Sequence, residues 1–108
     1  KRGDVLESEA SIVVIGDVNH GARVIAKGNI VILGSLHGSA YAGAAGNASA
    51  VVMAMEMVPM QVRIADFSTL PEDKGKKLGK GPVIASAQDD SIIVRPIRKS
   101  FLNYLNFI

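Results

Sequence analysis

The sequence contains no cysteine and no tryptophan, and only 5% of its 108 residues are aromatic. The lack of cysteine excludes disulfides and thiolate metal ligands, and it is compatible with a reducing cytoplasm. Because aromatic side chains are scarce, burial depends on small and branched residues, which suit closely stacked backbone better than a bulky globular centre. With 48% hydrophobic residues, the chain is long enough for one domain with a modest core. We expect a single domain over residues 1–108.

An excess of charge of one sign is also lacking, since the formal net charge is +2. Residues 67–108 carry seven basic and four acidic side chains, mainly in DKGKKLGK and RPIRK, whereas residues 1–66 carry five and six. These basic residues are not interleaved with aromatics, as they would be on a surface for single-stranded nucleic acid. Solvated loop lysines are the favoured interpretation, and we expect no nucleic-acid partner.

Long uninterrupted apolar segments are absent as well. The start, KRGDVLESEA, has acids where the apolar part of a signal peptide would begin. No charged residue occurs between Gly28 and Met55, a length that could span a bilayer. This stretch holds too many glycine, asparagine and serine residues for ordinary insertion, so we expect no transmembrane helix.

What the sequence does contain is a repeat of eighteen residues. IVVIGDVNHGARVIAKGN, residues 12–29, is followed by IVILGSLHGSAYAGAAGN, residues 30–47, and seven positions are identical. Short aliphatic runs bounded by glycine are typical of buried strands, and a fixed period with recurring strands is typical of a solenoid. We therefore predict an all-β fold: a short parallel β-helix of triangular cross-section with about eighteen residues per coil.

Strand alternation assigns a face to each side chain of the repeat. The side chains predicted to point inward are Ile12, Val14, Ile30 and Ile32. The side chains predicted to form an outward aliphatic ridge are Val13, Ile15, Val31 and Leu33. Such a ridge is too apolar for a monomer, so we predict that it is the interface of a homodimer. The repeated Gly28-Asn29 and Gly46-Asn47 pairs are predicted to occupy equivalent corners, with glycine at positive φ.

The second half of the chain continues the strand pattern less regularly. In AVVMAMEMVPMQVRIADF, residues 50–67, apolar and polar residues alternate as in half-buried strands. A methionine stripe at this spacing is typical of core packing, and an adaptable contact surface is the alternative. Residues 68–82 form a polar surface loop. Two further strands are predicted around a turn at Asp89-Asp90.

The last nine residues, SFLNYLNFI, have an apolar stripe and a serine N-cap that predict a short C-terminal helix. Docking of residues 100–108 on their own domain or on a partner subunit is the favoured interpretation. Because RPIRK precedes this tail, a membrane-surface anchor is the alternative.

Candidate catalytic residues are few. His20 and His37 are the only histidines, and β-helix enzymes of the hexapeptide-repeat type, acyltransferases or carbonic anhydrases, use histidine as base or zinc ligand. A catalytic zinc site usually has three protein ligands, and no third histidine exists. We expect no enzyme activity, metal or cofactor, and keep this enzyme class as the alternative.

Residues 16–47, GDVNHGARVIAKGNIVILGSLHGSAYAGAAGN, resemble the signature of the C-terminal domain of the septum-site determining protein MinC. Almost every fixed position of that signature is met, from Gly16 and Val18 to Gly43 and Gly46. The resemblance continues more loosely from Ile64 to Pro96. It implies a right-handed β-helix that forms homodimers and binds the membrane-associated ATPase MinD.

The resemblance also implies a biological role and a place in the cell. MinD recruits MinC from the cytoplasm to the inner face of the cell membrane, where the Min system controls division. A separate N-terminal domain of the family opposes FtsZ assembly, and these residues contain no candidate for it. We therefore expect a division inhibitor whose contact with FtsZ depends mainly on that other domain.

Residue by residue, the resemblance implies a MinD-binding surface at the start of this domain. The family stretch (R/K)-S-G-Q aligns with Lys1, Arg2, Gly3 and Asp4, of which Arg2 and Asp4 depart from it. Gly21 belongs to the same predicted surface, and Ser39 stands where some members carry arginine.

Overall fold

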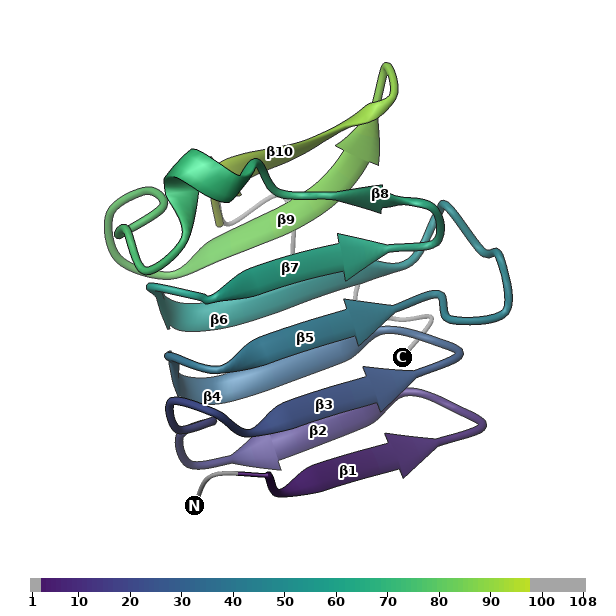
Figure 1. Ribbon diagram of the computed structural model, residues 1–108, viewed down its shortest axis with the longest axis horizontal. Helices are drawn as coiled ribbons and strands as arrows, with labels where there is room; N and C mark the ends of the chain where they lie inside the picture. The colour runs from purple at the N-terminus through teal and green to yellow at the C-terminus, as the bar shows by residue number, and fades with distance from the viewer. Residues whose placement is uncertain (1–2, 98–108) are drawn as a thin grey trace.

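The chain folds into stacked coils of β-strand. The computed structural model describes residues 3–97, and its elements follow one another along the stack (Figure 1). The strands are β1 (Val5–Ser8), β2 (Ile12–Ile15), β3 (Arg23–Ala26), β4 (Ile30–Leu36), β5 (Ser39–Ala42), β6 (Val51–Met57), β7 (Gln61–Ile64), β8 (Phe67–Ser68), β9 (Val83–Gln88) and β10 (Ser91–Pro96), with a 3-10 turn at Pro71–Asp73.

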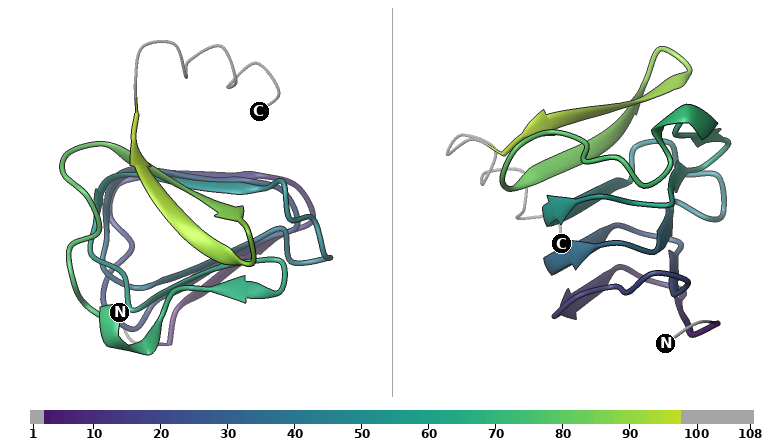
Figure 2. Two further views of the ribbon diagram at one scale, coloured as in Figure 1. Left: turned by 90° about the horizontal axis from the view of Figure 1, so that it is seen from above. Right: turned by 60° about the vertical axis from the view of Figure 1, so that its left-hand side comes forward.

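The strands form two five-stranded sheets. Sheet A has the order β1-β3-β5-β7-β8, and sheet B has the order β10-β9-β6-β4-β2. Pairing is parallel from β1 to β7 and from β2 to β6, and becomes antiparallel where β8, β9 and β10 join. Viewed along the stack, the coils trace a triangular outline (Figure 2). The predicted β-helix is confirmed.

The core lies between the sheets and consists of branched residues that follow one another from coil to coil. In sheet A, Val24, Ala40 and Val62 are register neighbours and are all buried. In sheet B, Ile12, Ile30 and Val52 form a second buried column. Each buried isoleucine or valine stabilises the fold by roughly 1.5–3 kcal/mol relative to an exposed one. The predicted inward direction of the first repeat positions is confirmed, with Val14 half-buried against this core.

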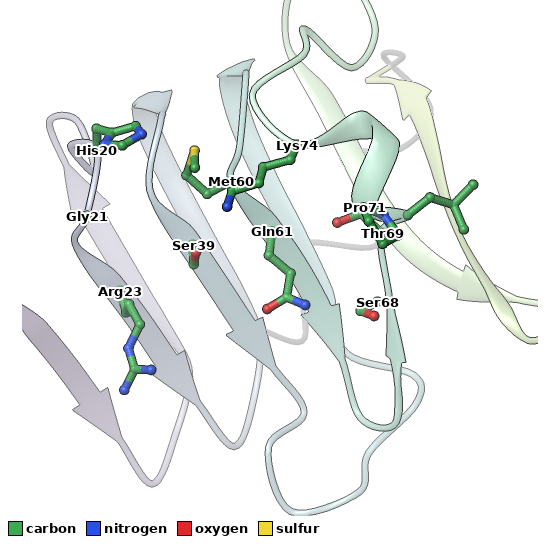
Figure 3. A pocket seen from close by; sticks show the side chains of 11 residues that line it. His20, Gly21, Arg23, Ser39, Met60, Gln61, Ser68, Thr69, Pro71 and Lys74 are labelled. Atoms are coloured by element: carbon green, nitrogen blue, oxygen red, sulfur yellow. The ribbon is translucent and has the colours of Figure 1, made fainter.

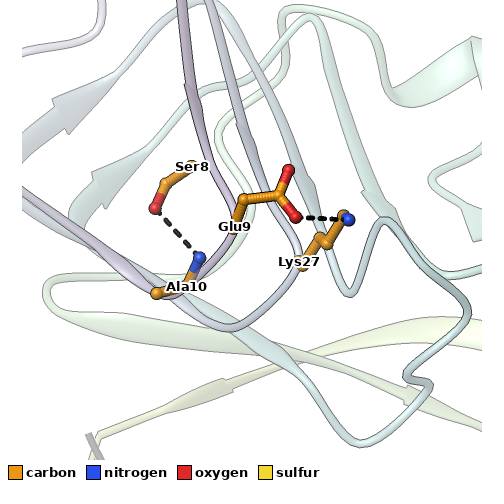
Figure 4. Close-up of polar contacts among 4 residues, drawn as sticks. All are labelled: Ser8, Glu9, Ala10 and Lys27. Atoms are coloured by element: carbon orange, nitrogen blue, oxygen red, sulfur yellow. Dashed lines mark hydrogen bonds and ion pairs between the residues drawn. The ribbon is translucent and has the colours of Figure 1, made fainter.

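The corners of the first two coils are joined by contacts between residues eighteen positions apart. Lys27 Nζ donates to a carboxylate oxygen of Glu9 in an exposed ion pair (Figure 4). The Asn29 N–H donates to Ser11 Oγ at 2.9 Å, and the Ser35 N–H donates to Asp17 Oδ1 at 2.7 Å. The sequence repeat therefore corresponds to one physical coil here.

The period changes after the second coil. On sheet A the partner of Arg23 is Ser39, and on sheet B the partner of Ile30 is Val52, so one step is shorter and the other longer than eighteen residues. Residues 43–50 form an extra loop, in which the N–H groups of both Gly46 and Asn47 donate to Gly43 O.

The prediction that the two Gly-Asn pairs stack is wrong for this reason. Asn29 is buried and its Oδ1 accepts from the Val51 N–H at 2.9 Å, whereas Asn47 lies exposed in the inserted loop. The prediction of positive φ at Gly28 is also wrong. Gly28 is needed for space, because a Cβ there would lie 2.5 Å from Ser11 Oγ.

The β9–β10 hairpin closes the C-terminal end of the stack. Its two-residue turn is Asp89-Asp90, with φ of 51° and 65°, and Gln88 pairs with Ser91 across it. The predicted turn is confirmed. The predicted C-terminal helix lies outside the described residues. Among residues 3–97, no helix is long and apolar enough to cross a membrane.

Candidate partner-binding surface

The N-terminal segment lies beside the corner that contains Gly21. The Gly3 N–H donates to Gly21 O at 3.2 Å, and the Arg23 N–H donates to Asp4 O at 2.8 Å. The corner itself is closed by a hydrogen bond from the Ala22 N–H to Asn19 O at 2.9 Å. The structure therefore brings together Gly3, Asp4 and Gly21, whereas Lys1 and Arg2 lie outside the described residues.

Both glycines of this contact adopt the left-handed backbone region, with φ of 88° at Gly3 and 89° at Gly21. Residues with a Cβ rarely adopt these angles. At Gly3 an added Cβ would meet no heavy atom within 4 Å, so the position is open to an approaching molecule.

A hollow of about 500 Å³ adjoins this corner on the outer side of sheet A. Its floor includes Arg23, Ser39 and Gln61, which are register neighbours on β3, β5 and β7 (Figure 3). Its other wall comes from β8 and the segment that follows, up to Lys74. We call this hollow, together with Gly3 and Gly21, the corner groove.

The corner groove has a one-sided electrostatic character. Arg23 and Lys74 contribute positive charge, and His20 lies at the same edge. None of the residues that line the hollow is acidic. Hydroxyl groups of Ser39 and Ser68 add hydrogen-bonding capacity. The groove is therefore suited to an acidic group presented by another molecule, because charged donors form the stronger hydrogen bonds to carboxylates.

A second cation lies further along the same sheet face. The Arg63 guanidinium stacks over the Tyr41 ring at 4.4 Å, and its Nε donates to Ala65 O at 3.0 Å. Arg23, Tyr41 and Arg63 together line a smaller hollow of about 130 Å³. The ring contact and the hydrogen bond fix the arginine head, so this face presents an ordered cationic surface.

The aliphatic ridge lies on the other sheet. Val13, Ile15 and Leu33 are exposed on the outer face of sheet B, at 52%, 87% and 45%, as expected. Val31 is 6% exposed, so the expectation that it would be an exposed member of the ridge is wrong. Met55, 46% exposed, extends the ridge on β6. The alternating methionines of residues 50–67 pointed to Met55, since a contact surface was one of the two interpretations of that stripe.

The two histidines meet at a shallow hollow, which His20 and His37 line together with Met60 and Gly75. Within residues 3–97, no group of three His, Cys, Asp or Glu side chains is placed to hold a metal ion. The described residues therefore supply no third ligand to His20 and His37, which the zinc-enzyme alternative would need.

Sequence reasoning missed Gln61, Arg63 and Lys74 as members of the cationic face. β7 reads as an alternating strand, which places Gln61 and Arg63 outward but says nothing about their neighbours. Lys74 reads as one of several loop lysines, and only the fold of residues 68–74 brings it to the groove.

The family model described as "Septum formation inhibitor MinC, C-terminal domain" matches residues 1–97. A probable septum site-determining protein MinC from Agathobacter rectalis is 42% identical, with 95% of this chain and 46% of that protein covered. The same protein from Geobacillus kaustophilus is 52% identical over 68% of this chain and 33% of its own length. The chain spans less than half the length of these curated relatives.

Structural similarity agrees with the sequence matches. A chain of the solved "MinC:MinD cell division protein complex" from Aquifex aeolicus superposes with a TM-score of 0.81 at 32% identity, over 99% of this chain and 89% of that one. The relatives are named as division proteins, so the alternative of a hexapeptide-repeat enzyme is not favoured.

Proposed function

Because this chain belongs to the family of the C-terminal domain of the septum formation inhibitor MinC, we propose that it is the dimerisation and MinD-binding part of a division inhibitor. The corner groove binds the ATPase MinD, and the exposed ridge on sheet B binds a second copy of the chain. Contact with FtsZ depends mainly on an N-terminal domain outside these residues. The domain lies in the cytoplasm and reaches the inner face of the cell membrane through MinD.

The observation that carries this proposal is the hydrogen bond between the Gly3 N–H and Gly21 O at 3.2 Å. It joins the stretch that aligns with the family's MinD-contacting motif to the corner that holds the Gly-Ala pair of the signature, Gly21 and Ala22. Both lie at the edge of a hollow with cations and no acid among its lining residues. A carboxylate-bearing loop of MinD fits this chemistry.

The first test separates charge from backbone strain at Gly21. With φ of 89°, any side chain is strained there, but asparagine and aspartate tolerate the left-handed region best and to a similar degree. We expect Gly21→Asp to weaken ATP-dependent MinD binding by about tenfold or more relative to Gly21→Asn, because like charges across an interface are repulsive. Binding is measured by pull-down or biolayer interferometry, with melting temperatures of both variants.

If both variants lose binding equally and their melting temperatures fall equally, Gly21 is needed for folding and not for contact with MinD. Unchanged binding in both, with both folded, would contradict the proposed site.

The second test reverses a groove charge. Arg23→Glu is expected to weaken MinD binding by at least about tenfold and to reduce the salt dependence of the remaining affinity. Lys80→Glu is the matched control, because Lys80 is exposed on the same polar loop as Lys74 but does not line the hollow. Equal effects of the two reversals would indicate attraction by net charge rather than a specific groove.

A further inference from the structure

A second hollow adjoins the corner groove where the coils turn from sheet B into sheet A. The turns between β4 and β5 and between β6 and β7 form this corner. The second hollow has a volume of about 650 Å³ and is the one that the two histidines line. His20 and Met60 line both hollows, so they lie at the boundary between them. The surface open to another molecule therefore continues from the outer face of sheet A across this corner.

Met60 combines a fixed backbone with a side chain that the core does not use. Its N–H donates to Gly38 O at 2.9 Å, and the Gly75 N–H donates to Pro59 O at 2.8 Å. The Met60 side chain is half-buried. Among the described residues, the core cluster and the side chains packed against it do not include Met60. A methionine side chain has three rotatable bonds and a polarizable sulfur, so this one can adapt to a molecule that approaches the corner.

The neighbours of Met60 make it an apolar group within a polar and cationic edge. Figure 3 shows its side chain between those of His20 and Lys74 at one end of the groove. Val58, also half-buried, lines the second hollow from the same turn. Pro59 between them is buried. Valine and methionine are therefore the apolar side chains that this turn presents to another molecule.

The second hollow matches the corner groove in charge. None of the described residues that line it is acidic, and His37 adds an imidazole that can form a hydrogen bond. An apolar contact beside charged groups excludes water and thereby strengthens the electrostatic attraction next to it. Such a surface fits a carboxylate that lies beside a bulky apolar side chain. The carboxylate would reach Arg23 and Lys74, while the apolar group packs against Met60.

We propose that the surface bound by MinD crosses this corner, and that Met60 is its apolar contact. The inference rests on the proposed function and adds to it the chemistry that the partner has to present. MinD contributes an acidic side chain to the groove and, next to it, a bulky apolar side chain that packs on Met60 and Val58. Met60 then determines specificity, because acidic surfaces without the apolar neighbour bind less well.

Met60 can report this contact in the unmodified chain, since the oxidation of a methionine depends on its exposure. The full chain is treated with dilute hydrogen peroxide alone, with MinD and ATP, and with MinD and ADP. The sulfoxide at each methionine is followed by peptide mass spectrometry. We expect MinD with ATP to slow the oxidation of Met60 at least about fivefold. Met55, 46% exposed on sheet B, is the control and should react at the same rate in all three mixtures.

Two substitutions separate an apolar contact from a general loss of structure. Met60→Gln keeps the length of the side chain but makes its end polar, so it should weaken MinD binding roughly tenfold. The salt dependence of the affinity should stay as in the parent chain, because no charge is changed. Met60→Leu keeps an apolar group of similar volume and should bind within about twofold of the parent chain. Melting temperatures are measured for both variants.

Three results would overturn this inference while the proposed function stands. Met60 could oxidise equally fast when MinD is bound. Met60→Gln could bind MinD like the parent chain although Arg23→Glu does not. Met60→Gln could lose binding together with a flatter salt dependence, which would mean that Met60 only positions Lys74. If Met60→Gln melts at a much lower temperature, the oxidation of the unmodified chain decides. Failure of the parent chain to bind MinD would contradict the proposed function itself.

Discussion

Glycine is required in this chain for two separable reasons, conformation and space. Gly75, in the surface loop, has a φ of 76° and no heavy atom within 4 Å of an added Cβ. Gly38 needs no positive φ, but a Cβ there would lie 2.3 Å from Ala22 O and 2.5 Å from Asn19 O. Those oxygens belong to the corner of the preceding coil, so Gly38 sets how closely two coils can stack.

We therefore expect Gly38→Ala to destabilise the fold by about 2–3 kcal/mol, because backbone atoms must move to admit one methyl group. Gly75→Ala, which introduces only strain at positive φ, should cost about 1 kcal/mol. Urea denaturation followed by circular dichroism measures both. Equal small losses would mean that neighbouring coils separate more easily than their contacts indicate.

At the scale of elements, the two sheets have outer faces of opposite chemistry. Sheet A presents Arg23, Gln61 and Arg63, whereas sheet B presents Val13, Ile15, Leu33 and Met55. Side chains alternate in direction in the same way on both sheets, so the two faces differ only in the types of residue that point outward. The two surfaces proposed for MinD and for a second copy thus lie on different sheets and do not overlap.

Ile15, 87% exposed at the end of β2, is the residue with which the ridge can be tested. Ile15→Asp should weaken self-association at least about tenfold, since a two-fold interface would meet the buried charge twice. Val5→Asp is the control, because Val5 is exposed to 48% but lies on sheet A. Sedimentation equilibrium of the parent chain is expected to give about twice the chain mass. A parent chain that is monomeric at micromolar concentration would contradict the interface.

The β9–β10 hairpin offers a change that should stabilise the protein. Asp89 and Asp90 both have positive φ, as a type I′ turn requires, and Asn-Gly adopts that turn with less strain. Replacing the pair by Asn-Gly should also remove the repulsion between two adjacent carboxylates. We expect a gain of about 1 kcal/mol in the free energy of unfolding, measured from the shift in the urea midpoint. A loss would show that one of the carboxylates makes a needed contact.

At the scale of the whole molecule, the sequence repeat predicted the fold because adjacent coils repeat each other's contacts. Ile12 and Ile30 are paired in the register of β2 and β4, so their spacing of eighteen residues is the length of one coil. The predicted stacking of Asn47 on Asn29 is wrong. Asn47 matches Asn29 in the sequence repeat, but it lies in the loop of residues 43–50, so it is not at the equivalent position of the next coil. For Val31 only the expected exposure is wrong: alternation gives the outward direction of the side chain, but it does not give the exposed fraction, which is 6%.

The candidate site was only partly predictable for the same physical reason. Gly3 and Gly21 came from the resemblance, and the backbone places them in direct contact. Ser39, Gln61 and Lys74 reach the groove from later coils and from an irregular loop, and no spacing rule relates them. The FtsZ-directed domain expected elsewhere in the whole protein, and the MinD and dimer contacts, stay predictions.

The antiparallel pairing of β9 with β6 limits how copies of this chain can extend one another. Within the described residues, the last strand of sheet B is β10, which carries Arg95 and Pro96. A proline has no N–H for an incoming strand, and an edge charge discourages pairing. The hairpin therefore ends the stack of coils within the chain. Its edge disfavours the addition of a strand from another copy, which is the step by which stacked coils would grow into a fibre.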